Sequence, residues 1–227
     1  MTTIVPARWH ADGYALLPAL VGPADCERLA VEADAAFAGA VGARNPLAQP
    51  WCRALAANLR TQPALRTLLP DGHVAVQCTY FSKSTTRNWL VALHQDLAIA
   101  VAERVDDVRL GGWSVKDGVP HVQPPADVLD ALVAVRVHLD DCGARDGPLR
   151  VVPGSHRQGR LPDDGADRLR DAHGLVDCLA QRGDALALRP LLLHASSKAS
   201  GASRRRVLHY VFGPRELPYG LRWHDAI

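Results

Sequence analysis

The sequence predicts a mainly β fold of the sandwich or barrel type, preceded by a largely helical N-terminal third. Its 227 residues suit one large domain. Helix-like segments fill the first third, and from His73 onward short β-rich runs alternate with turns rich in Gly, Pro and Asp. We therefore expect a single domain over residues 1–227, with a helical part over about 1–72 and a β core over about 73–213.

The N-terminal elements follow from their flanking residues. An Asp12-Gly13 turn precedes a short apolar strand at 14–17. A helix is expected from Gly22-Pro23 to about Phe37, where apolar and charged positions recur at helical spacing. Two further helices, at 50–59 and 63–69, each begin at a proline, whose missing N–H costs nothing in the first turn.

Seven strands are expected in the β core, separated by turn-forming residues. They lie at 74–82, 89–101, 132–139, 149–152, 185–188, 191–194 and 205–213. The segment 105–125 contains several glycines and prolines, so we expect an irregular excursion of the kind that often carries function or acts as a lid.

Composition excludes several classes of protein. Hydrophobic residues make up 48% and charged residues 22%, and the net charge is +2. Basic residues gather only at Arg204, Arg205 and Arg206, which argues against nucleic acid, and no apolar run or leader pattern suggests a membrane or export. The five cysteines are scattered, as expected of reduced, buried thiols in the cytoplasm. We expect a monomer or homodimer whose partner is a small-molecule substrate.

Two histidines and an aspartate could hold a metal. In His94-Gln95-Asp96, residues i and i+2 of a strand share a face, so both can reach one ion, although a polar strand end is the simpler explanation when this pair is taken alone. His194 ends the apolar run Leu191-Leu192-Leu193 and could be the third ligand, or a satisfied core histidine. Two His and one carboxylate form the facial triad of non-haem Fe(II) oxygenases.

Arg205 adds an anion site to this pattern. Strand alternation at 205–212 places Arg205, Val207, His209 and Val211 on one face. An inward guanidinium needs an anion, and its planar fork suits a carboxylate such as the distal end of 2-oxoglutarate. The alternative is a surface ion pair, which we expect for Arg204 and Arg206.

With these residues in place, the chain resembles the phytanoyl-CoA dioxygenase family of Fe(II)/2-oxoglutarate oxygenases, which includes ectoine hydroxylase. The motifs that carry the resemblance are His94-Gln95-Asp96, Leu139-Asp140-Asp141, the stretch from Gly147 to His156, His194 and Arg205. The resemblance implies a double-stranded β-helix, or jelly roll, with N-terminal helices packed outside. It also implies Fe(II), 2-oxoglutarate and O2 as cofactor and cosubstrates.

By the same resemblance, His94, Asp96 and His194 would bind iron and Arg205 would bind the 2-oxoglutarate C5 carboxylate, assisted by the Ser196 hydroxyl. Intact Asp96 favours hydroxylation, because related halogenases replace this carboxylate with a small residue.

Other positions bear on cosubstrate and substrate. Gln77 matches the glutamine that faces cosubstrate and product in ectoine hydroxylase. Thr79 and Phe81 stand where that enzyme has polar residues, which argues against ectoine as the substrate. Arg136 and His138 share one strand face with Asp140 and either line a pocket or face outward.

Trp113 either caps the substrate or packs within its loop. The reaction implied is hydroxylation of an unactivated C–H bond of a small polar molecule, an amino acid or biosynthetic intermediate, with release of succinate and CO2. The alternatives are a cupin-like metal-dependent hydrolase or isomerase and a jelly roll that binds a small ligand without turnover.

Overall fold

The computed structural model describes residues 7–162, 164–201 and 204–227. The strands in these ranges are β1 (Tyr14–Leu17), β2 (Gly42–Ala43), β3 (Val74–Lys83), β4 (Val91–His94), β5 (Ile99–Ala100), β6 (Gly111–Lys116), β7 (Val119–Gln123), β8 (Val133–His138), β9 (Leu149–Val151), β10 (Val176–Cys178), β11 (Ala185–Leu188), β12 (His194–Ser196) and β13 (Arg205–Gly213). The α-helices are α1 (Ala7–Asp12), α2 (Pro23–Ala36), α3 (Pro50–Thr61), α4 (Pro63–Arg66), α5 (Ala126–Asp130) and α6 (Gly165–His173). Three short 3-10 turns complete the set: η1 (Pro46–Ala48), η2 (Ala144–Asp146) and η3 (Ser155–Gln158).

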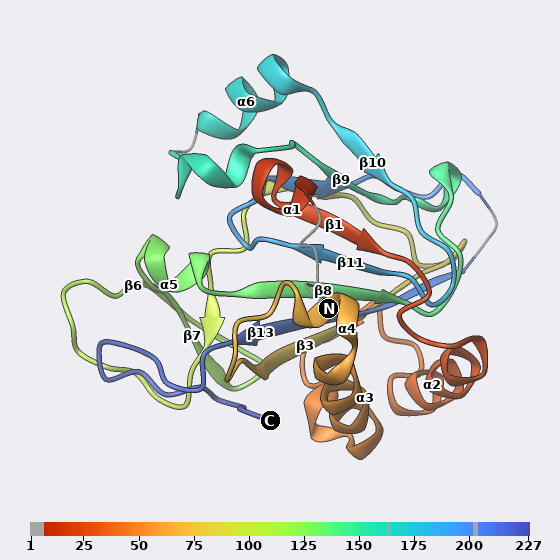
Figure 1. Cartoon of the computed structure of the whole chain (residues 1–227), viewed down its shortest axis with the longest axis horizontal. Coiled ribbons are helices and arrows are strands. Elements are labelled where there is room, and N and C mark those ends of the chain that lie inside the picture. The colour runs from red at the N-terminus through yellow and green to blue at the C-terminus, as the bar shows by residue number, and fades with distance from the viewer. Residues whose placement is uncertain (1–6, 163, 202–203) are drawn as a thin grey trace.

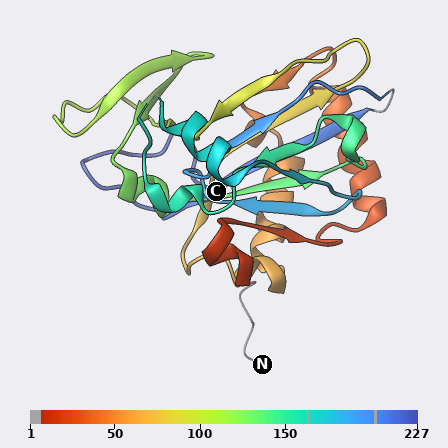
Figure 2. The same cartoon turned by 90° about the horizontal axis from the view of Figure 1, so that it is seen from above.

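Two antiparallel sheets form the body of the molecule. The larger has the order β1-β11-β8-β13-β3-β2 and the smaller the order β10-β9-β12-β4. They enclose an interior between them, and a third sheet, β5-β7-β6, projects from one end as the arm seen in Figure 2. The architecture is the jelly roll that the sequence predicted.

Helices α2, α3 and α4 lie together on the outer side of the large sheet (Figure 1). Leu29 of α2 and Leu55 of α3 are buried in the same hydrophobic cluster as Val135 and Tyr210 of the sheet. The alternate residues of β8 and β13 therefore point the other way, into the interior. The N-terminal part is not purely helical, because β1 pairs with β11 at the edge of this sheet.

The 89–101 run is two strands rather than one. Strand β4 ends at His94 and β5 begins at Ile99, because the Asp96 N–H turns away to donate to Pro190 O at 2.9 Å. Near the C-terminus, residues 191–193 form a buried turn and His194 begins β12, so the expected strand at 191–194 was wrong. An apolar run alone does not distinguish a buried turn from a strand.

We expected an irregular excursion at 105–125. The segment instead contains the β6–β7 hairpin. Asp117 and Gly118 form its turn with positive φ values of 51° and 81°, the conformation that favours Asp-Gly in two-residue hairpins. Helix α6 and strand β10, which the sequence analysis did not identify, lie between β9 and β11.

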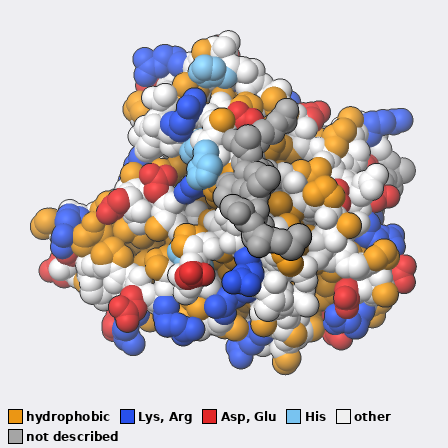
Figure 3. Space-filling view, viewed as in Figure 1, with side chains coloured by type: hydrophobic (Ala, Val, Ile, Leu, Met, Phe, Trp, Pro, Cys, Tyr) orange, Lys and Arg blue, Asp and Glu red, His pale blue; other side chains and the backbone are white. Residues whose placement is uncertain are grey.

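The distribution of surface charge and the burial of the cysteines agree with what the composition predicted. Figure 3 shows basic and acidic side chains interspersed over the face in view. All five cysteines are free and buried. Among the described residues, none of the helices has the length and apolar character needed to cross a membrane.

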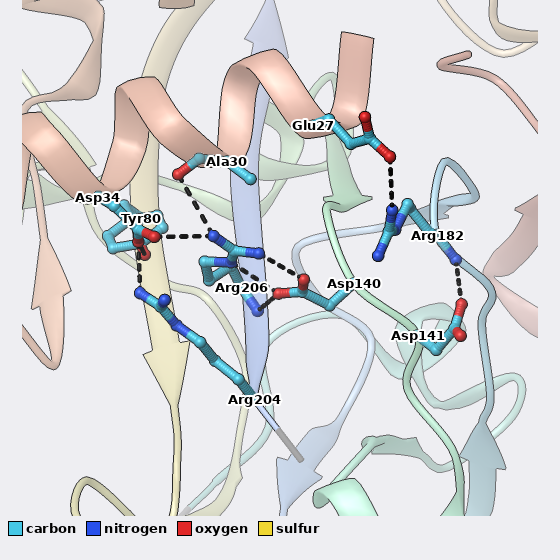
Figure 4. A network of polar contacts seen from close by, with 9 residues as sticks. All are labelled: Glu27, Ala30, Asp34, Tyr80, Asp140, Asp141, Arg182, Arg204 and Arg206. Carbon is cyan, nitrogen blue, oxygen red and sulfur yellow. Dashed lines mark hydrogen bonds and ion pairs between the residues drawn. The ribbon is translucent and has the colours of Figure 1, made fainter. Parts of the chain in front are cut away.

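One ion-pair network joins α2 to the sheet (Figure 4). Arg206 of β13 reaches Asp140 at 2.6 Å and Asp34 of α2 at 2.9 Å, and its side chain is 14% exposed. It also donates to Ala30 O. Arg206 is thus ion-paired, as expected, although more deeply buried than a surface pair. We expected Asp140 to share a strand face with Arg136, but β8 ends at His138, and Asp140 lies on the outer side of the sheet, where it pairs with Arg206.

Replacing Arg206 with Ala should destabilise the protein. It leaves Asp34 and Asp140 half-buried without their shared cation, at an expected cost of about 2 kcal/mol, less than for a fully buried pair. Urea unfolding followed by circular dichroism measures this. The matched control is Arg168→Ala, which removes an exposed i,i+4 pair with Asp164 on α6 and should change stability by less than about 0.5 kcal/mol. Equal effects of the two changes would contradict the role assigned to the network.

Candidate metal and cosubstrate site

His94, Asp96 and His194 come together at one end of the jelly roll. The antiparallel pairing of β12 with β4 sets His194 directly opposite His94, and their ring centroids are 4.3 Å apart. Asp96 Oδ1 lies 3.6 Å from His94 Nε2, and Asp96 Oδ2 lies 3.7 Å from His194 Nε2. One potential ligand atom from each residue lies within 4.8 Å of the other two. The three residues singled out in the sequence therefore form one cluster.

Both histidines are held in the tautomer that a metal ligand requires. His94 Nδ1 lies 2.8 Å from Ala92 O, and His194 Nδ1 lies 2.9 Å from Leu192 O. A carbonyl oxygen only accepts, so each Nδ1 carries a proton, and Nε2 is the ring nitrogen on the side of Asp96 that can bind a metal. Two imidazole nitrogens and a carboxylate on one face of a metal ion suit a divalent first-row transition metal such as Fe(II), and they leave its other coordination positions open. The donor set therefore fits the predicted metal.

The charge state of this cluster also suits a cation. Burial by itself would raise the pKa of Asp96, but the His194 and His94 interactions outweigh burial and hold that pKa well below its usual range. Burial lowers the pKa of His194, which favours its neutral form. Burial would lower the pKa of His94 as well, but its interaction with the Asp96 carboxylate outweighs burial and raises that pKa. Asp96 is thus an anion that favours a positive charge beside it, as a bound cation would supply.

A third imidazole lies beside the cluster. His209 Nε2 is 3.8 Å from Asp96 Oδ2, and His209 Nδ1 accepts a hydrogen bond from Arg136 at 3.3 Å. Burial, followed by the charge of Arg136, lowers the pKa of His209 to about 3, so this imidazole is neutral. The alternation of β13 placed His209 on the face of Arg205, but the sequence analysis gave it no role.

A cationic pocket lies farther along the same strands. Arg205 is 3% exposed. Its guanidinium donates to Gly147 O, and its Nε has no partner among the described residues. Ser196 Oγ donates to the same carbonyl at 3.0 Å. Gly147 has a φ of +64°, and a Cβ there would lie 2.5 Å from Ser197 O, so glycine is required at this position.

Lys83 is the residue of this pocket that the sequence analysis missed. It pairs with Arg205 across β3 and β13 and is 1% exposed. Its ammonium donates to Ser196 Oγ at 2.7 Å and to Ser197 O at 2.6 Å. Burial, followed by the nearby charges of Arg205 and Arg136, lowers the pKa of Lys83 to about 8. Two buried cations that have no acidic partner among the described residues form a site for an anion.

Gln95, between the two ligands of the HxD motif, fixes the backbone that carries them. Its Nε2 donates to Leu191 O at 2.6 Å and to Gly159 O at 2.8 Å. Its Oε1 accepts from Leu161 N at 2.9 Å. The side chain thereby ties the metal-ligand turn to the segment before His194 and to the loop after η3.

The metal cluster and the cationic pocket open into one cavity of about 500 Å³. A cavity of this size suits a small molecule. Gln77, Thr79 and Arg136, which the sequence analysis assigned to cosubstrate or substrate, line it. Lys116, His121 and Gln123 add a wall from the β6–β7 arm.

His138 and Trp113, both predicted to contact substrate, do not line this cavity. His138 is buried beside Arg136 and Arg205, and burial lowers its pKa to about 3. Trp113 packs against the cluster that includes Leu110 and Val122, with Arg104 over its ring. These contacts show that the Trp113 ring packs within the arm, which was the alternative interpretation.

Comparison with known proteins agrees with this geometry. The model of the phytanoyl-CoA dioxygenase (PhyH) family matches residues 9–207. L-proline trans-4-hydroxylase from Streptomyces griseoviridis is 31% identical over a segment that covers 34% of this chain and 38% of that enzyme. The chain thus matches well under half of this curated relative.

Two solved structures show the same fold. EctD from S. alaskensis in its apo form is 20% identical, with a TM-score of 0.70, over 97% of this chain and 81% of that chain. It has also been solved with bound Fe. HygX from Streptomyces hygroscopicus, solved with nickel, 2-oxoglutarate and hygromycin B bound, is 21% identical, with a TM-score of 0.62, over 96% and 94% of the two chains.

The family match begins before β1 and extends into β13, so it includes all three clustered metal-ligand candidates and Arg205. The resemblance drawn from His94-Gln95-Asp96, His194 and Arg205 is therefore confirmed. The chain belongs to the phytanoyl-CoA dioxygenase family.

Proposed function

We propose that the protein is an Fe(II)- and 2-oxoglutarate-dependent dioxygenase that hydroxylates an unactivated C–H bond of a small polar molecule, such as an amino acid or biosynthetic intermediate. One observation carries the proposal. A cluster of two imidazoles and a carboxylate shares a cavity with buried cations that have no acidic partner among the described residues. The first suits Fe(II) and the second suits the distal carboxylate of a dicarboxylic acid.

In this proposal His94, Asp96 and His194 hold the metal through two Nε2 atoms and a carboxylate oxygen. Arg205 and Lys83 bind the C5 carboxylate of 2-oxoglutarate, and Ser196 orients the Lys83 ammonium. When bound, iron and 2-oxoglutarate supply O2 activation, with release of succinate and CO2 and transfer of one oxygen atom to the substrate. Solved structures of HygX and EctD support this assignment, because they contain nickel with 2-oxoglutarate and Fe, respectively.

The protein's own contribution is positioning and exclusion of water. The Ala92 and Leu192 carbonyls keep the two imidazoles aimed at the metal position. Phe81 and Val207 pair across β3 and β13 between the cationic pocket and the row of His209, so the cosubstrate chain would lie over apolar side chains. A cosubstrate bound over these apolar side chains would limit the water that reaches the reacting atoms.

Removing the Arg205 guanidinium should abolish cosubstrate binding. With Arg205→Ala, anaerobic addition of Fe(II) and then 2-oxoglutarate should give no visible charge-transfer band at concentrations that saturate the wild type, because about a hundredfold of affinity is lost. Arg204→Ala is the control, since that neighbouring side chain pairs with Asp34 outside the cavity and should leave the band intact. A wild-type protein that binds Fe(II) but gives no band would favour a cupin-like hydrolase or a binding module.

Cosubstrate affinity should fall as pH rises above about 8. The Lys83 ammonium has a pKa near 8 before the cosubstrate binds, and a bound carboxylate raises that pKa. Affinity is therefore constant below pH 8 and weakens by up to about tenfold per pH unit above it. Calorimetric titration of the nickel-loaded protein with 2-oxoglutarate from pH 7 to 9 measures this. Lys83→Met should bind more weakly and lose the dependence, and persistence of the full pH dependence in that variant would contradict the assignment.

Replacing Gln95 with Leu should weaken metal binding by about 10- to 100-fold, as changes around metal ligands commonly do. The change removes three hydrogen bonds that hold the backbone of the ligand turn but no ligand itself. Optical titration with Co(II) reports affinity without turnover. Gln181→Leu, at an exposed position away from the cavity, is the control, and equal Co(II) affinities in the two variants would refute a positioning role.

A further inference from the structure

Arg136 is a buried guanidinium in the cavity with no acidic partner among the described residues. It lies on β8, is 7% exposed and lines the cavity. It donates to neutral His209 at 3.3 Å and lies 5.5 Å from the centre of the Phe81 ring. Its Nε has no hydrogen-bond partner among the described residues. The Arg206 guanidinium shows the contrast, because two carboxylates neutralise it (Figure 4).

The cavity offers no spare carboxylate for Arg136. The described residues that line it include five cationic side chains, Arg44, Lys83, Lys116, Arg136 and Arg205, and Asp96 is the sole acid among them. Asp96 belongs to the metal cluster. Burial, followed by the charge of Arg205, lowers the pKa of Arg136 to about 10. The guanidinium is therefore still charged at neutral pH. An unpaired buried charge is costly, so an anionic ligand is required to complete the site.

Strand register separates this cation from the cosubstrate pocket. Arg136 pairs with His209 on β13, and Lys83 pairs with Arg205. These rows are four residues apart, about 13 Å along an extended strand. Arg136 therefore lies on the far side of the Phe81 and Val207 row from Arg205, next to the imidazole that borders Asp96.

The wall beyond Arg136 is mainly aliphatic, although Gln77, which pairs with Val211 across β3 and β13, also lines the cavity there. The next inward residues are Ala134 on β8 and Val211 on β13, which pair directly. Leu129 and Leu132 line the cavity as well. Two exposed cations also line the cavity: Lys116, which adds positive charge, and Arg44, which is paired with Asp117 at 3.2 Å. The chemistry of this end of the cavity is that of a carboxylate site followed by a hydrocarbon surface.

We propose that the primary substrate is a small carboxylic acid with an aliphatic body, and that Arg136 binds its carboxylate while the body lies against Val211 and Leu132. This inference rests on the proposed function and specifies its substrate class. Arginine rather than lysine suits the role, because its planar fork holds a carboxylate in one orientation. The contact would set which carbon of the substrate faces the metal.

The test uses matched acids and amides as probes. The protein is loaded anaerobically with Fe(II) and 2-oxoglutarate, and L-proline, L-valine and L-leucine are each titrated against the corresponding primary amide. At least one acid should perturb the visible band and stimulate succinate formation when O2 is admitted, and its amide should not. A panel in which no acid acts, or in which amides act as well as acids, would overturn the proposal.

Variants of Arg136 separate this inference from the function on which it depends. Arg136→Gln should keep the band of bound 2-oxoglutarate but weaken the response to the active acid by about 10- to 100-fold. Arg136→Lys, which retains charge, should recover part of it, whereas Arg222→Gln, at an exposed arginine paired with Glu103, should match the wild type.

Loss of the band itself in Arg136→Gln would assign this guanidinium to the keto acid and overturn the inference while the oxygenase function stands. Unchanged response to the acid in Arg136→Gln would also overturn it. Absence of a band in the wild type would instead count against the proposed function.

Discussion

The register of β13 between β3 and β8 is the constraint on which the site depends. Side chains on a strand alternate, so a slip of one residue would send Arg205 outward and bring Arg206 into the cavity. The two arginines have opposite requirements. Arg206 is matched by two carboxylates on the outer side, beneath α2, whereas Arg205 faces a cavity in which Asp96, of the metal cluster, is the sole acid among the described lining residues. The outer ion pairs therefore stabilise the register that supplies the inner cation.

Features set by local pattern were predictable from the sequence. Two-residue periodicity placed His94 beside Asp96 and put Arg205 and His209 on one face, and helix-starting prolines marked α2, α3 and α4. Features set by pairing between distant segments were not. Lys83 joins Arg205 only through strand register, and the signal that could have found it is a lysine ending an otherwise apolar strand. Asp140 was misplaced because the end of β8 depends on where the chain meets Arg206.

The interior charge distribution opposes the stability of the fold. Lys83, Arg136 and Arg205 lie buried around one cavity whose lining contains a single carboxylate. Each desolvated cation carries a free-energy penalty that packing elsewhere must offset. The large cluster between the sheet and helices α2 and α3 lies on the opposite face of the same strands. The outer face of β8 and β13 thus stabilises the fold through packing. The inner face carries cations whose charge is not balanced until ligands bind.

The β6–β7 arm has a consequence for how such a protein can diversify. It contributes Lys116, His121 and Gln123 to the cavity wall but none of the clustered metal-ligand candidates and neither of the paired cations Lys83 and Arg205. Its sheet, β5-β7-β6, is separate from the two sheets that carry those groups. Sequence drift, insertion or recombination in this hairpin can therefore reshape selectivity while the reactive apparatus is inherited intact, so the arm is a module on which selection can act independently.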